Sequence, residues 1–184
     1  MSTSKKDLIN YIESDNSWYN PSGLKNILIA KFTNCPYLKI KKYLYLLRYQ
    51  EYYINTANGN KIKGLLGLYY ERKKNKLGSL LGIEIGPNCF GKGLQIFHAG
   101  SIIVNSSVQA GENCKLHGAN CIGNNGKDDK TPILGNGVDI GYGAVLIGDI
   151  FIADDVVIGA NALVNHSFDT PSSIIAGVPA KIIK

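Results

Sequence analysis

Apolar residues recur at every sixth position through the second half of the chain, in two runs separated by a polar stretch. Ten of the twelve positions are Val, Ile, Leu or Phe. The first run is Phe90, Ile96, Ile102, Val108, Cys114 and Asn120, and the second is Leu134, Ile140, Leu146, Ile152, Ile158 and Val164. A period of six fits neither a helix nor a plain strand. It is typical of a hexapeptide-repeat parallel β-helix, in which each coil stacks on the coil below.

Three hexads make one triangular coil, so residues about 18 apart are expected to lie above one another. The solenoid is predicted to begin at Ile83–Pro87 and to lose its register after Asn120. Fourteen residues separate Asn120 from Leu134, two more than two hexads. The segment between them, residues 123–132, is polar and rich in turn formers, which predicts a loop that leaves the coil.

Residues 1–80 instead show the periodicity of helices, with a capping residue at Ser4 and Asp7 three positions later. A turn is expected at residues 20–23, and residues 77–79 are interpreted as a hinge into the repeat. Helices are predicted at residues 4–14, 24–33, 37–55 and 62–75. The predicted fold class is therefore mainly β: a parallel β-helix at residues 81–184, preceded by a small α-helical domain at residues 1–80.

Charge divides the chain unevenly. Residues 1–81 contain 14 Lys and Arg against 5 Asp and Glu, a net charge of +9, whereas residues 82–184 carry −3. The basic part has no nucleic-acid-binding motif, so nucleic acid is not expected as a partner. An acidic glycan, a lipid-linked intermediate or a peripheral contact with a membrane surface fits better. The alternative is a solvated, lysine-rich helical surface, and the sequence leaves both open.

The remaining composition predicts a cytoplasmic protein. No run of 18 apolar residues exists, so no membrane span is expected, and the polar amino terminus shows no secretory signal. The four cysteines show no metal-binding spacing, so no metal site is predicted, and we interpret them as reduced, mostly buried thiols. They are Cys35, Cys89, Cys114 and Cys121.

Two of the three histidines are expected to share an edge of the solenoid. His98 follows Ile96 by two positions, and His117 follows Cys114 by three. If Cys114 lies above Ile96, the two imidazoles lie one coil apart, about 5 Å, beside the predicted loop. A lone histidine is more often a structural residue, as we expect for His166, but a stacked pair indicates a site.

The order of these features resembles that of the serine O-acetyltransferases and, more broadly, of hexapeptide-repeat acyltransferases that include bacterial surface-polysaccharide O-acetyltransferases. The resemblance covers residues 82–184. It rests on the ladder, on the segment Ile96–Gly100 around His98, on the loop opening Cys121–Lys127 and on the terminal motif Ala176–Lys181.

This resemblance implies a left-handed coil, a homotrimer with active sites between subunits, and acetyl-CoA as co-substrate. His98 falls where these enzymes carry the catalytic base, and His117 where a relative can carry a second histidine. For the coenzyme, Tyr142 and Ala160 are flat or small residues at coil turns, Asn124 could cradle the pantetheine arm and Lys181 could meet a phosphate. Ala160 could instead be a tight-turn residue, and Lys181 a solvated terminal lysine.

Two departures from the serine acetyltransferase pattern direct the choice of acceptor. Phe97 stands where those enzymes carry an Asp before the base, and Lys130-Thr131 stand where they carry an Arg-His pair. Both changes remove groups that would orient an amino acid. The prediction is therefore an acetyl-CoA-dependent O-acetyltransferase that acts on a sugar hydroxyl of a surface polysaccharide or its precursor. The alternatives are a serine O-acetyltransferase of cysteine biosynthesis and a non-catalytic trimeric scaffold.

Overall fold

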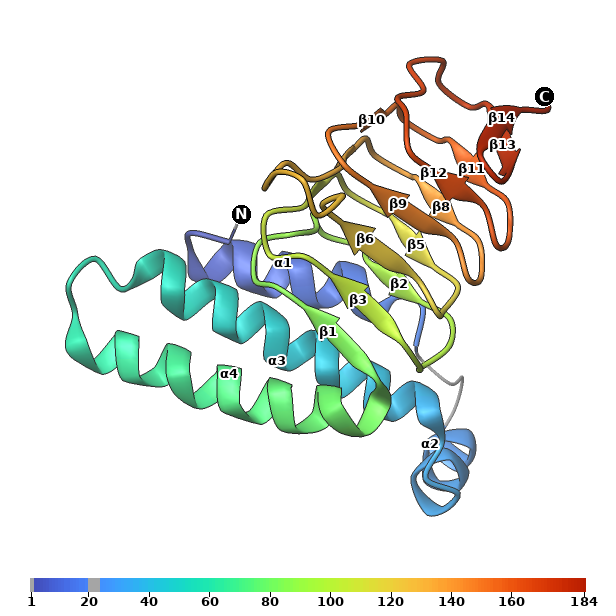
Figure 1. The fold of residues 1–184 in the computed structure, drawn as a ribbon. Coiled ribbons are helices and arrows are strands. Elements are labelled where there is room, and N and C mark those ends of the chain that lie inside the picture. Colours follow the sequence, from blue (N-terminus) through green and yellow to red (C-terminus); the bar gives the residue numbers. More distant parts are fainter. Residues whose placement is uncertain (1, 20–23) are drawn as a thin grey trace. The chain divides into compact units, whose positions relative to one another are not determined.

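The computed structural model describes residues 2–19 and 24–184, which form two compact units, Met1–Leu81 and Gly82–Lys184 (Figure 1). The turn predicted at Asn20–Gly23 lies outside the described residues. Among those that are described, no helix is both long and apolar enough to span a bilayer.

Helices build the first unit. They are α1 (Lys5–Asn16), α2 (Leu24–Phe32), α3 (Pro36–Thr56) and α4 (Lys61–Leu81), and α1 and α4 both pack on α3 (Figure 1). The start of α1 confirms the capping prediction, because the Ser4 hydroxyl accepts from the Asp7 N–H at 3.0 Å and the Asp7 carboxylate accepts from the Ser4 N–H at 2.9 Å.

The predicted hinge at residues 77–79 is wrong, because these residues lie inside α4. A glycine and a serine are tolerated within a helix that other contacts hold. The helix ends instead before Gly82, whose φ of +65° is left-handed. A Cβ at Gly82 would meet the Ser101 backbone nitrogen at 2.8 Å. Glycine at this position therefore satisfies both the backbone turn and the close approach.

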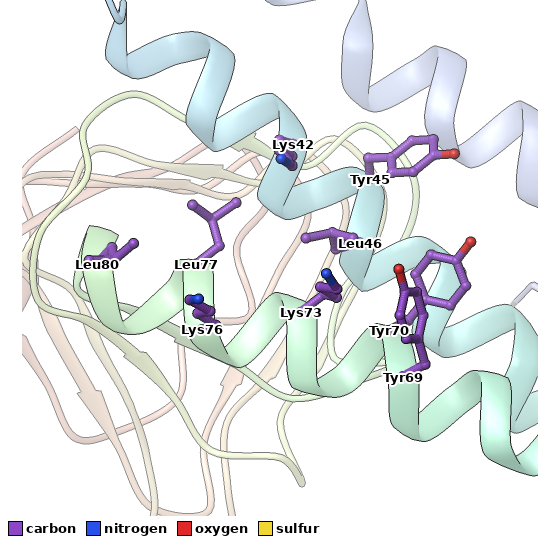
Figure 2. Close-up of a pocket in the computed structure, with 9 residues that line it drawn as sticks. All are labelled: Lys42, Tyr45, Leu46, Tyr69, Tyr70, Lys73, Lys76, Leu77 and Leu80. Carbon is purple, nitrogen blue, oxygen red and sulfur yellow. The ribbon is translucent and has the colours of Figure 1, made fainter.

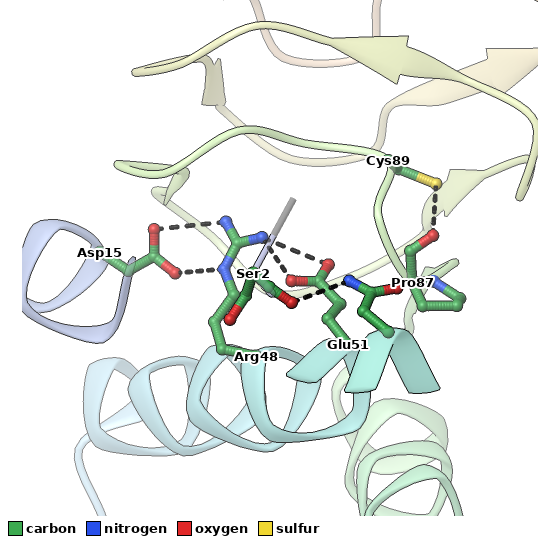
Figure 3. A network of polar contacts seen from close by, with 7 residues as sticks. Ser2, Asp15, Arg48, Glu51, Pro87 and Cys89 are labelled. Atoms are coloured by element: carbon green, nitrogen blue, oxygen red, sulfur yellow. Dashed lines mark hydrogen bonds and ion pairs between the residues drawn. The ribbon is translucent and has the colours of Figure 1, made fainter. Parts of the chain in front are cut away.

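A buried arginine links α1 to α3 (Figure 3). Arg48 is fully buried, with its Nε 2.8 Å from Asp15 Oδ2 and one terminal nitrogen 2.9 Å from Glu51 Oε2. Its guanidinium also lies 4.9 Å from the centre of the Tyr11 ring. Burial opposes the charge, but the carboxylates of Glu51 and Asp15 together hold the pKa of Arg48 above its ordinary value. This charge network fixes how α1 sits on α3.

A basic groove of about 470 Å³ lies between α3 and α4 (Figure 2). Its lining residues are apolar, aromatic or cationic: Lys42, Tyr45, Leu46, Tyr69, Tyr70, Lys73, Lys76, Leu77 and Leu80. A hydrogen bond with Tyr49, burial and neighbouring tyrosines raise the pKa of Tyr45 to about 12, so that phenol stays neutral. Part of the positive charge of the helical unit gathers along this groove.

Residues 82–184, which are described throughout, form a coil whose successive turns stack their strands into three sheets (Figure 1). Sheet A consists of β1 (Ile83–Ile85), β3 (Ile102–Val104), β6 (Cys121–Gly123), β9 (Val145–Ile147) and β12 (Leu163–Val164). Sheet B consists of β4 (Gln109–Ala110), β7 (Ile133–Leu134) and β10 (Phe151–Ile152). Sheet C consists of β2 (Gln95–Ile96), β5 (Lys115–Leu116), β8 (Asp139–Ile140), β11 (Val157–Ile158), β13 (Ile174–Gly177) and β14 (Ala180–Ile182). All pairings are parallel except β13 with β14, which confirms the predicted parallel β-helix.

Sheet C stacks one buried aliphatic residue per strand over five successive coils. In sheet C this ladder is Ile96, Leu116, Ile140, Ile158 and Ile175, all of which are buried. Stacking them removes a continuous column of apolar surface from water, at roughly 25 cal/mol per Å². The hexad period is therefore the packing period of the core.

The predicted register between successive coils is wrong by two residues at Ile96. Ile96 pairs with Leu116 and not with Cys114. The turn after Ile96 holds the two extra residues, and it contains Gly100 and Ser101 at φ +116° and +49°. Cys114 is nonetheless buried, because both inward positions of a hexad are apolar here. For that reason the sequence pattern could not tell which of the two positions forms the ladder.

The cysteines differ in their surroundings, and no disulfide joins any two of them in the described structure. Cys89 and Cys114 are buried, Cys35 is half-buried and Cys121 is exposed. Burial raises the pKa of the Cys114 thiol to about 12, with Asp154 adding to the effect and the Val138 N–H opposing it. The prediction that the cysteine thiols are mostly buried is therefore confirmed for Cys89 and Cys114 only.

We expect Cys114 to resist alkylation in the native protein. At pH 8 a thiol with a pKa of about 12 is ionised in only roughly one molecule in 10⁴. Iodoacetamide at pH 8, followed by peptide mass spectrometry, should leave Cys114 unmodified until a denaturant is added. Native alkylation of Cys114 as fast as that of a thiol in a short unfolded peptide would contradict this placement.

Candidate functional site

His98 lies at the edge where sheet C turns into the next strand of sheet A, here called the C–A edge. Its side chain is exposed. Continuing the β2–β5–β8 register places His98, Gly118 and Tyr142 in one column. A Cβ at Gly118, whose φ is +121°, would lie 3.3 Å from the His98 Cβ and 3.1 Å from the Tyr142 ring. Glycine at position 118 thus lets the histidine and the tyrosine approach each other along this edge.

His117 lies on the neighbouring coil but not directly above His98. The same register places it opposite Phe97, and its imidazole stacks on the Phe97 ring with centroids 4.3 Å apart. Its Nε2 lies 2.8 Å from Asp139 Oδ1. The two histidines therefore flank the same edge from adjacent coils, one position out of register. The predicted register placed His117 above residue 99. The two extra residues in the turn after Ile96 move it to the position above Phe97.

The structure brings together three of the four residues predicted to hold the coenzyme. Tyr142 follows β8 and Ala160 follows β11 at the C–A edge, and both are exposed. Lys181 lies in β14, opposite Ala176, in the hairpin that ends the same sheet, and it is exposed as well. His98, Tyr142, Ala160 and this hairpin therefore succeed one another along one side of the solenoid.

Asn124 and the loop lie elsewhere. They follow β6 of sheet A, at the edge that leads into sheet B. The prediction that the histidines adjoin the loop is therefore wrong within one chain, because they follow sheet C. Asn124 Oδ1 accepts a hydrogen bond from the Gly126 N–H at 3.3 Å, which stabilises the loop's own turn.

Lys130 is engaged within the loop region. Its ammonium group forms an ion pair and hydrogen bond with Asp149, and this contact raises the pKa of Lys130. Both side chains are largely exposed, so the pair adds little to stability. Lys130 occupies a position where the resemblance implied an acceptor-binding residue. In the structure its ammonium group pairs with Asp149 instead.

His166 has a different environment from the other two histidines. Its Nδ1 lies 3.1 Å from the side-chain oxygen of Asn165, and its ring lies 4.5 Å from that of Phe168. It follows sheet A, away from the C–A edge. It remains interpreted as a structural residue.

Sequence reasoning missed a charged pair beside the C–A edge. Lys115 and Asp139 face each other across β5 and β8, with Nζ 3.2 Å from Oδ2. A signal was present, because two opposite charges at outward positions of the same column can meet across a parallel ladder. The wide spacing between them in the sequence hid it, since the loop lengthens this coil beyond three hexads.

The arrangement suits proton removal from a hydroxyl group. An exposed imidazole can accept a proton from a bound alcohol, and backbone N–H groups of the turns can stabilise an oxyanion. Tyr142 and Ala160 are exposed along the same edge as His98.

Comparison with known proteins gives one consistent kind of relative. The serine acetyltransferase of Helicobacter pylori (strain J99) is 36% identical over 107 residues, which are 56% of this chain and 62% of that enzyme. The chain thus covers less than two thirds of that relative's length. No protein-family model matches the chain.

Solved structures share the fold. The serine acetyltransferase of Neisseria gonorrhoeae superposes with a TM-score of 0.70 at 23% identity, covering 97% of this chain and 68% of that one. A serine acetyltransferase in complex with CoA gives a TM-score of 0.71 at 23% identity, covering 97% and 71%. These enzymes combine helices with a β-helix, as this chain does.

The predicted sugar acceptor is wrong, because the relatives that match the chain are serine acetyltransferases and none of those compared above is a polysaccharide O-acetyltransferase. The prediction rested on the absence of acceptor-orienting charges at Phe97 and Lys130-Thr131. In the structure Phe97 stacks on His117 and Lys130 pairs with Asp149.

Proposed function

We propose that the chain transfers the acetyl group of acetyl-CoA to the hydroxyl of L-serine, as a serine O-acetyltransferase of cysteine biosynthesis. One observation carries this proposal: the match to a serine acetyltransferase at 36% identity over 107 residues. That stretch is longer than the whole helical unit, Met1–Leu81, so it includes part of the repeat. The exposed His98 at an open edge of the repeat supplies the group that the reaction requires.

His98 acts as general base in the proposed mechanism. The serine hydroxyl oxygen attacks the thioester carbonyl while the His98 imidazole accepts its proton, because an alcohol is a poor nucleophile at neutral pH. Backbone N–H groups stabilise the oxyanion of the tetrahedral intermediate. The C–S bond then breaks, and the coenzyme sulfur takes the proton from the imidazolium. The products are O-acetylserine and CoA.

The coenzyme is proposed to lie along the C–A edge. Tyr142 and Ala160 leave room for the pantetheine arm, and Lys181 can offer a point charge to a phosphate. The homotrimer with active sites between subunits and the left-handed coil are both inferred from the resemblance to serine acetyltransferases. Asn124 belongs to another edge of the same chain, so in such a trimer it would reach this site from a second subunit.

An apolar column on sheet A also favours assembly. Outward residues of neighbouring strands line up in the order Ile103, Cys121, Val145 and Leu163. Half of the Ile103 side chain is exposed, and a column of this kind is a common subunit contact.

We place the acyltransferase in residues 81–184 and the helical domain in residues 1–80. The cysteines are free thiols, which suits a protein of the cytoplasm.

The acceptor assay tests this proposal. Release of CoA thiol from acetyl-CoA is followed with L-serine, L-threonine and a panel of sugars as acceptors. We expect release that depends on the protein and is far faster with serine than with any sugar. Release with a sugar at the serine rate or above would overturn the proposal. No release with any acceptor would favour the trimeric scaffold instead.

A further inference from the structure

The basic groove between α3 and α4 has the size and the lining of a binding site for a small molecule (Figure 2). Its volume of about 470 Å³ is in the range of ligand pockets in proteins. Lys42 and Leu46 line it from α3, and Lys73, Lys76 and Leu77 line it from α4. Each of the two helices therefore contributes both cations and apolar side chains to the groove.

No carboxylate compensates the positive charge of the groove. The helices α3 and α4 together contain ten Lys and Arg against two Glu, and neither Glu lines the groove. Within the part of the chain that the structure describes, Lys42, Lys73 and Lys76 form no ion pair. The arginine of α3, Arg48, is by contrast paired with carboxylates. Three ammonium groups around one groove are complementary to an anion with more than one negative charge.

The groove also exposes apolar surface next to these cations. Tyr45 and Tyr69 are 40% and 52% exposed, and Leu80 is 77% exposed, whereas Leu46 is buried. The Lys73 ammonium group lies 5.4 Å from the centre of the Tyr69 ring, so a cation stands directly beside an aromatic wall. An inorganic anion bound to the lysines alone would leave this apolar surface in water. The lining therefore fits a ligand that carries an apolar part as well as negative charge.

We propose that the basic groove binds a soluble amphiphilic anion, in which a phosphate group is joined to an apolar body. A phosphate monoester carries about 1.5 to 2 negative charges at neutral pH and three acceptor oxygens, which suits several ammonium groups at once. The apolar body covers Leu77, Leu80 and the tyrosine rings, and each methylene that becomes buried should tighten binding about fourfold. The groove belongs to the helical unit, so this inference goes beyond the proposed function and does not depend on it.

The shape and charge of the groove favour a single small molecule over two larger occupants. A flat bilayer surface would contact the exposed side chains, such as Leu80, but would leave the deeper surface of Leu46 and Leu77 uncovered. An isologous contact with a second copy of the chain would place two sets of the same lysines in one interface, and like charges repel. One molecule that enters the groove meets neither difficulty.

Octyl phosphate is the probe that tests the site, and inorganic phosphate and 1-octanol represent its two parts. Calorimetry on the intact protein should show that octyl phosphate binds more tightly than either part, and that added salt weakens its binding. Replacing both Lys73 and Lys76 by methionine keeps the aliphatic stems and removes two charges, so the Kd for octyl phosphate should rise about tenfold or more. Leu80→Ser should raise the same Kd about threefold or more, because the ligand covers part of that side chain.

Lys6→Met is the matched control, because Lys6 is an exposed lysine of α1 that does not line the groove. Its replacement should leave the Kd unchanged, and circular dichroism should show the same helix content in every variant. If the double replacement loses helix content, Lys42→Met makes the same test from α3 with one charge.

Three results would overturn the inference. The first is no binding of octyl phosphate at millimolar concentration, or binding that the groove variants weaken no more than Lys6→Met does. The second is binding to phosphatidylglycerol vesicles without binding of octyl phosphate, which would point to a membrane surface as the partner. The third is a molar mass, measured by light scattering, that falls in the groove variants, which would show that a second copy occupies the groove.

Discussion

Replacing His98 by alanine is expected to lower kcat by roughly 100-fold or more, because general-base assistance contributes about 10² to 10⁴ in rate. The His98 side chain is exposed at the C–A edge and supports no core packing, so the fold should be unaffected. Acetyl-CoA binding should survive, since backbone groups and coils beyond His98 are proposed to hold the coenzyme. The measurements are turnover with serine and coenzyme binding by calorimetry.

His166→Ala is the matched control, as another histidine with an exposed side chain, and should leave turnover unchanged. His117→Ala should cost less than His98→Ala and should act partly on KM for serine, since His117 flanks the same edge from the adjacent coil. If His98→Ala binds acetyl-CoA normally and turns over near the parent rate, the base assignment is wrong. His117, with its carboxylate partner, would then be the first candidate for the base.

Replacing Arg48 by methionine is expected to lower the free energy of unfolding of the helical unit by about 3–5 kcal/mol. The substitution fills a similar volume but leaves the carboxylates of Asp15 and Glu51 buried without the cation that compensates them. Isolated buried charges are strongly unfavourable, whereas the intact network roughly balances its desolvation. The measurement is chemical denaturation followed by the helical circular dichroism signal.

Arg72→Met provides the control, because Arg72 is the other arginine of the chain and lies exposed on α4. Its replacement should change the unfolding free energy by no more than about 0.5 kcal/mol. An Arg48→Met protein as stable as Arg72→Met would show that the network contributes nothing, and would contradict its assignment as the link between α1 and α3.

Periodicity in the sequence was enough to predict the architecture. The hexad ladder predicted the parallel β-helix, and the capping residues Ser4 and Asp7 predicted the start of α1. Each of these signals is local or repeats along the chain. The end of α4 was missed because the residue that stops it, Gly82, acts through its left-handed backbone and its contact with Ser101, which is distant in sequence.

The site was only partly predictable, for a reason that the register makes clear. Counting hexads aligns Tyr142 with Ala160, 18 residues later, but the two extra residues near Gly100 shifted His117 onto Phe97. Lys115 and Asp139 meet only because the loop lengthens the spacing of their coils. An insertion changes which residues of successive coils face each other. The hexad period does not show where in the coil the insertion falls.

Product analysis shows whether the protein transfers the acetyl group to serine. The intact protein is incubated with L-serine and acetyl-CoA that carries a deuterated acetyl group, and mass spectrometry quantifies acetylated serine alongside released CoA. We expect equal amounts of CoA and O-acetylserine, both of which fall together in the His98→Ala protein. CoA release without acetylserine, or no release at all, would contradict it.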